Sequence, residues 1–192
     1  MLPFLHDRLQ RLDDLLGSSS EAMRAYTERD LGYCDRVAAL LERVGTEYAA
    51  MGRADAENDV RALGAMLAAA RQGIDALTSE RVNGRRREFE RSVALRGLLS
   101  SGERLRADHT EVQQTLTQAR EQLVPLLLFA VGRGLVPPGT GELTQDELEH
   151  LWQALVTDPE SRAAAQSVAT RIAAPDVLIL LGELAHDAAV RG

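Results

Sequence analysis

Apolar residues recur at spacings of three and four along most of this chain, which is the pattern of amphipathic helices. The first stripe runs from Leu2 to Leu16, and Gly17 with the three serines after it predicts the end of that helix. A second helix is expected from Ser18, because Ser18 and Glu21 have the spacing of a capping box.

The second stripe continues to Met51, and a stop is expected between Gly52 and Asp55. Asp55 is a suitable N-cap for a third helix, whose apolar positions run from Val60 to Leu77. The heptad then fails near residue 81, so a break is predicted before the fourth helix.

The fourth stripe keeps the a and d positions of five consecutive heptads, interrupted by Gly102 and His109. A helix from Arg85 to Leu123 would be about 58 Å long, which is long for a compact globule of this size. An antiparallel hairpin or a dimeric coiled coil would cover it. The residues that we predict to meet a second copy are Leu95, Leu98, Leu105, His109, Val112 and Leu116.

Three shorter helices are expected after a linker rich in glycine and proline at 132–142. Their start signals are a Thr144/Glu147 capping box, the sequence Asp158-Pro159-Glu160, and Pro175-Asp176. The fold class is therefore all-α. Residues 1–131 form a long-helix bundle or antiparallel coiled-coil hairpin, 132–142 a linker, and 143–192 a three-helix subdomain.

The composition agrees with this fold class, because the helix formers Leu and Ala, at 30 and 28 residues, far outnumber the β-branched Val and Ile, at 13 and 3. Cys34 is the single cysteine, which excludes an intrachain disulfide and fits a reducing compartment. The longest apolar stretch, Leu123 to Val131, has nine residues, whereas a membrane span needs roughly 20. We expect a cytoplasmic protein without a membrane partner.

Two Glu-x-x-His pairs, Glu147/His150 and Glu183/His186, have the spacing that di-iron bundles use to aim two ligands at one metal. Both pairs fall on the polar side of their predicted helices, so they are expected to face solvent rather than bind a metal. His109 has no acid or nucleophile identifiable beside it, and a histidine at such a position usually sets helix register. We expect no catalytic residue, no metal and no cofactor.

All 22 basic residues are arginine, and they concentrate in the middle of a chain with net charge −7. Residues 1–79 sum to −4 and 138–192 to −6, whereas 81–106 sum to +5. Such a stretch suits an acidic face of another copy, or phosphate. The residues predicted to bind an anionic partner or nucleic acid are Arg81, Arg85, Arg86, Arg87, Arg91, Arg96, Arg104 and Arg106.

These patterns favour a non-enzymatic helical protein, an adaptor or assembly factor that binds a second copy of itself as a homodimer and also an unidentified protein. The alternative is a DNA- or RNA-binding protein that uses the arginines of 81–106. The third hypothesis is an enzyme built as a metal-binding helical bundle.

Overall fold

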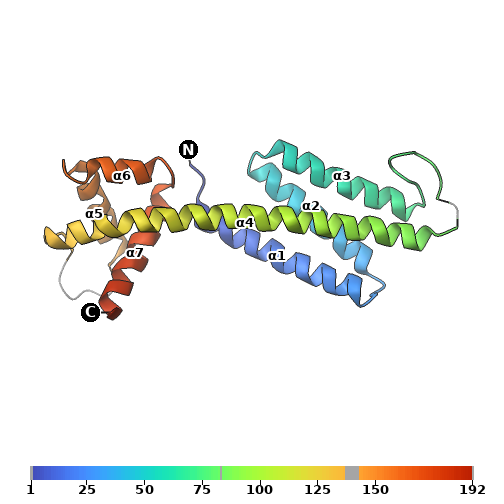
Figure 1. Cartoon of the computed structure of the whole chain (residues 1–192), viewed down its shortest axis with the longest axis horizontal. Helices are drawn as coiled ribbons and strands as arrows, with labels where there is room; N and C mark the ends of the chain where they lie inside the picture. Colours follow the sequence, from blue (N-terminus) through green and yellow to red (C-terminus); the bar gives the residue numbers. More distant parts are fainter. Residues whose placement is uncertain (1, 83, 137–142, 192) are drawn as a thin grey trace. The chain divides into compact units, whose positions relative to one another are not determined.

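The computed structural model describes the backbone of residues 2–82, 84–136 and 143–191. These residues form seven helices and no strand, which confirms the all-α prediction (Figure 1). Two compact units are present: a four-helix unit, Arg11–His109, and a C-terminal unit made of Met1–Gln10 and Thr110–Gly192. The helices are α1 (Leu5–Thr27), α2 (Tyr33–Ala50), α3 (Ala54–Arg71), α4 (Arg86–Gly132), α5 (Gln145–Thr157), α6 (Arg162–Ala169) and α7 (Ala174–Arg191).

The boundary between the units lies within α1 and α4, each of which contributes residues to both. The sequence analysis predicted the domain boundary in a linker at 132–142 instead. Residues 137–142 lie outside the described part of the chain, so that linker stays a prediction.

The predicted break at Gly17 is wrong, because α1 continues through it to Thr27. The hydroxyls of Ser18 and Ser20 donate to carbonyls four residues earlier, so these serines are accommodated inside the helix. The break comes instead between Thr27 and Tyr33, where Arg29 takes the left-handed conformation at φ 58°.

The predicted stop after Met51 is confirmed, and Gly52 turns the chain at φ 68°. Asp55 is not the N-cap of α3, because the helix already begins at Ala54 and Arg53 occupies the cap position. The third helix ends at Arg71, before the last apolar positions of its predicted stripe. In Figure 1 α2 and α3 form a helical hairpin.

Helix α4 is longer than predicted, with 47 residues, and continues past Pro125 to Gly132. Its part up to His109 packs in the four-helix unit, where Gly102 is buried against Ser19 of α1. A Cβ at Gly97 would lie 3.3 Å from Leu41 Cδ1, so this glycine permits the close approach of α2. The interruption of the heptad at Gly102 thus marks a contact between two small residues.

The C-terminal unit buries the inner faces of α5, α6 and α7 against one another. The Thr144/Glu147 capping box is confirmed, since Thr144 Oγ1 accepts from Glu147 N and the carboxylate accepts from Thr144 N. Helix α6 begins at Arg162, and Asp158 Oδ1 accepts from the backbone N–H of Glu160 in the turn before it.

Candidate interaction surfaces

The apolar stripe of α4 that was predicted to meet a second copy is largely covered by the chain itself. Its core members are at most 7% exposed in a single copy, namely Leu98, Leu105, Val112 and Leu116. Leu95 is half-buried, and His109 Nε2 lies 2.9 Å from Asp13 Oδ1 of α1. Packing within one chain accounts for this stripe, and self-association through it stays a prediction.

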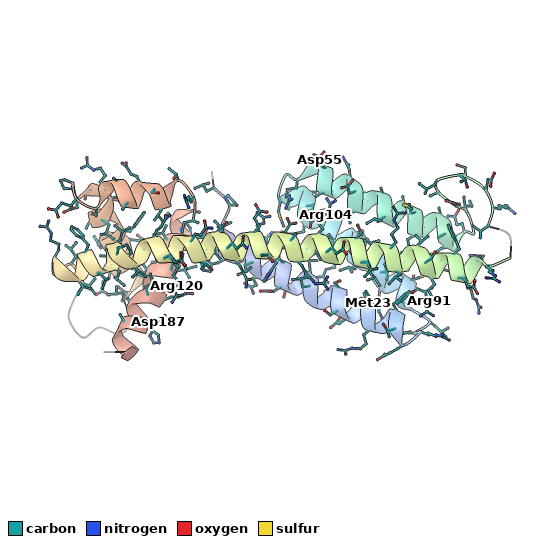
Figure 2. The ribbon with its side chains drawn as sticks, viewed as in Figure 1. Met23, Asp55, Arg91, Arg104, Arg120 and Asp187 are labelled. Carbon is teal, nitrogen blue, oxygen red and sulfur yellow. The ribbon has the colours of Figure 1, made fainter. Side chains whose placement is uncertain are left out.

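Two of the predicted anion-binding arginines leave α4 toward different neighbours (Figure 2). Arg91 places its guanidinium 4.6 Å from the ring centroid of Tyr26 on α1. Arg104 NH2 lies 2.6 Å from Asp59 Oδ2 on α3. Since one reaches α1 and the other α3, these two arginines do not share a face of α4.

The remaining arginines of the set are exposed. Arg85 makes a 3.4 Å contact with Glu88, and Arg86 donates to the backbone carbonyl of Arg71. Binding of an anionic partner or nucleic acid by this stretch stays a prediction. The other exposed members are Arg81, Arg87, Arg96 and Arg106.

A buried polar cluster that the sequence reading missed lies where α2 and α4 meet. Asp108 is 3% exposed and accepts a hydrogen bond from the Tyr48 hydroxyl at 2.7 Å and another from the Arg53 guanidinium. Burial, followed by the bond to Asp108, raises the pKa of Tyr48. The cluster ties α2 and the start of α3 to the middle of α4.

A second buried carboxylate joins α7 to the start of α1 within the C-terminal unit. Asp176 is fully buried, and its two oxygens accept the backbone N–H groups of Leu5 and His6, each at 2.9 Å. His6 Nδ1 lies 2.6 Å from Asp176 Oδ1, and because a carboxylate only accepts hydrogen bonds, this ring nitrogen is the donor. Asp176 therefore caps the first turn of α1 from another helix.

The two Glu-x-x-His pairs are both exposed. Glu147 serves the capping box, and Glu183 Oε2 is bonded to Arg120 of α4. Figure 2 shows Arg120 beside Asp187, its second partner. Among the described residues, no group of three or more His, Cys, Asp or Glu side chains is placed to hold a metal ion.

The thiol of Cys34 is buried in the four-helix unit. Burial, with a hydrogen bond to Glu90, raises its pKa from 9.0 to about 11. A thiol in such surroundings carries little thiolate near neutral pH and is a poor nucleophile.

Alkylation of native Cys34 by iodoacetamide at pH 8 should therefore be about a hundredfold slower than in denaturant, because the raised pKa lowers the thiolate fraction by about that factor. Mass spectrometry measures the alkylation rate. Equal alkylation rates in the native and denatured protein would contradict the burial.

The free energy of unfolding should also fall as the pH rises from about 9 to about 11, because the folded protein holds the thiol proton more tightly than the unfolded chain. Urea titrations at several pH values measure this stability.

Exposed apolar side chains concentrate in the C-terminal unit. It carries seven of the ten large hydrophobic residues that are exposed in the described part of the chain. Three of them follow one another along α4 at spacings of four and three: Val124, Leu128 and Val131, here called the α4 row. Leu128 is the most exposed at 67%.

The α4 row belongs to a helical stretch that is apolar all round. Leu123, Leu126, Leu127 and Ala130 are buried on its other side. A helix that is hydrophobic on every side is normally covered on every side, but the described part of this chain covers only one side of it. The α4 row is thus an unpartnered helix face.

Two apolar hollows of about 650 and 730 Å³ flank Trp152, and Pro175 lines both. Ile179 lies on the first hollow, and Leu2 and Phe4 lie on the second. Together with the α4 row, these three side chains make up six of the seven exposed large hydrophobic residues of the C-terminal unit. We call the two hollows together the Trp152 groove.

Comparison with known proteins found no match: no family model, no curated protein and no solved structure matches the chain. Among the described residues, none of the helices is both long enough and apolar enough to cross a bilayer.

Proposed function

We propose that this chain is a non-enzymatic helical adaptor or assembly factor, and that its C-terminal unit binds a second copy of the chain. One observation carries the proposal: the α4 row leaves two turns of apolar helix exposed, opposite a side that is already buried. Aliphatic residues at spacings of four and three form the seam of helix-to-helix interfaces.

A second copy is the occupant that the surface favours. The C-terminal unit carries both an exposed apolar row on α4 and an apolar groove, so one copy offers two hydrophobic surfaces that another copy can cover. Binding of a further protein through the same unit would extend the role to that of an adaptor.

The proposal predicts that the wild-type protein is a dimer at micromolar concentration and that Leu128→Glu weakens the dimer more than about tenfold. A carboxylate in the centre of an apolar contact loses its water without gaining a partner. Sedimentation equilibrium over about 1 to 100 µM measures the association.

The matched control is Leu77→Glu, which places the same charge on another exposed leucine, 75% exposed and outside the C-terminal unit. This variant should dimerise as the wild type does. Thermal melts followed by circular dichroism confirm that both variants are folded. A wild-type protein that remains monomeric over the whole range would refute the proposal.

A further inference from the structure

The length of the α4 row limits the size of the interface that the row can form by itself. It spans residues 124 to 131, which is about 11 Å of helix. Stable protein interfaces use about 20 to 30 residues on each side. Two rows packed on each other would bury a patch far smaller than that, so the row needs a larger counterpart.

The Trp152 groove is the larger apolar surface in the same unit. It is lined mostly by apolar side chains from α5, the start of α7 and the N-terminal residues, with Gln145, Glu149 and Gln153 beside one hollow. The apolar face of a helix typically docks into a groove of this kind, whose lining is mainly hydrophobic.

We infer that the α4 row of one copy occupies the Trp152 groove of another copy, an inference that rests on the self-association proposed above. If each copy both inserts a row and receives one, the assembly is a two-fold dimer that contains the contact twice. That arrangement covers both exposed apolar surfaces of the unit and enlarges the interface toward the usual size.

The single tryptophan makes the contact directly observable. Trp152 is partly exposed and lies between the two hollows. Insertion of an aliphatic row beside it removes water from the indole, so its emission should move to shorter wavelength as the wild-type concentration rises. In Leu128→Glu the emission should stay constant over the same range.

A mixing experiment separates row-to-groove docking from row-to-row docking. One variant, Leu128→Glu, has a damaged row and an intact groove with its tryptophan. The other, Ile179→Glu combined with Trp152→Phe, has a damaged groove, an intact row and no tryptophan. Each variant alone should associate more than about tenfold more weakly than the wild type.

The mixture should associate, because one intact row still meets one intact groove, and the emission of the only tryptophan should move to shorter wavelength. Phe4→Glu, on the second hollow, replaces Ile179→Glu if that variant melts at a lower temperature than the wild type. Leu77→Glu is again the control that should change nothing.

The failures of the two proposals are distinguishable. If both groove variants dimerise as the wild type does and the mixture does not associate, the row packs on a second row. The inference is then wrong, while self-association through α4 stands. If the wild type is monomeric, the proposed function itself fails.

Discussion

Replacing Asp108 with alanine is expected to lower the free energy of unfolding of the four-helix unit by about 2–4 kcal/mol. The substitution removes the acceptor of the Tyr48 hydroxyl, which is buried, and leaves the Arg53 guanidinium without its carboxylate. A buried hydroxyl without a partner contributes about 1–3 kcal/mol of this loss. The lost charge-assisted bond adds less, because the Arg53 side chain is 39% exposed.

The matched control is Asp59→Ala, which removes a carboxylate that also pairs with an arginine but is itself exposed. Its effect should stay below about 1 kcal/mol, since exposed ion pairs contribute little. Tyr48→Phe should fall between the two, because it removes the hydroxyl and the bond together. Urea denaturation followed by circular dichroism measures all three. Equal losses for Asp108→Ala and Asp59→Ala would show that burial does not set the importance of Asp108.

The position of Asp108 could have been read from the sequence, although its partners could not. Asp108 lies three residues after Leu105 and four before Val112, so it falls on the same face of α4 as these two buried residues. An aspartate on a buried face requires hydrogen-bond donors. The donors Tyr48 and Arg53 come from about sixty residues earlier, and only the packing of α2 against α4 brings them there.

Helical periodicity predicted the fold class and the apolar stripe of α4, because the a and d pattern depends on local spacing alone. Four of the six residues named on that stripe are buried, namely Leu98, Leu105, Val112 and Leu116. The helix ends were less predictable where local signals compete. Gly17 and the serines after it are typical helix stops, but Ser19 is buried and packs near Gly102 of α4. Tertiary packing therefore favours a continuous α1 over the break that local propensity predicts.

The candidate interaction surface could likewise be predicted from the sequence only in part. The stretch Leu123–Val131 was recognisable as the longest apolar run, but its sequence alone cannot indicate which side the rest of the chain covers. The structure buries Leu123 and Leu127 and exposes Leu128. The Trp152 groove could not be predicted from the sequence, because its lining comes from three separate segments of the chain.

Asp176→Ala should destabilise the C-terminal unit by about 2–4 kcal/mol, because three donors lose their acceptor at once. Two of them are backbone N–H groups in the first turn of α1, where no carbonyl of the helix can replace the carboxylate. Hydrogen exchange should therefore accelerate most at the amides of Leu5 and His6.

Two further variants distinguish this capping role from a general effect of removing charge. Asp176→Asn keeps one oxygen as an acceptor and should lose less stability than Asp176→Ala. Asp187→Ala removes a partly exposed carboxylate that pairs with Arg120 on the surface, and should change stability by less than about 1 kcal/mol. Unchanged exchange at Leu5 and His6 in Asp176→Ala would contradict the role of α7 in capping α1. Exchange that accelerates there while the rest of α1 stays protected would show that this buried carboxylate holds the first turn of the helix.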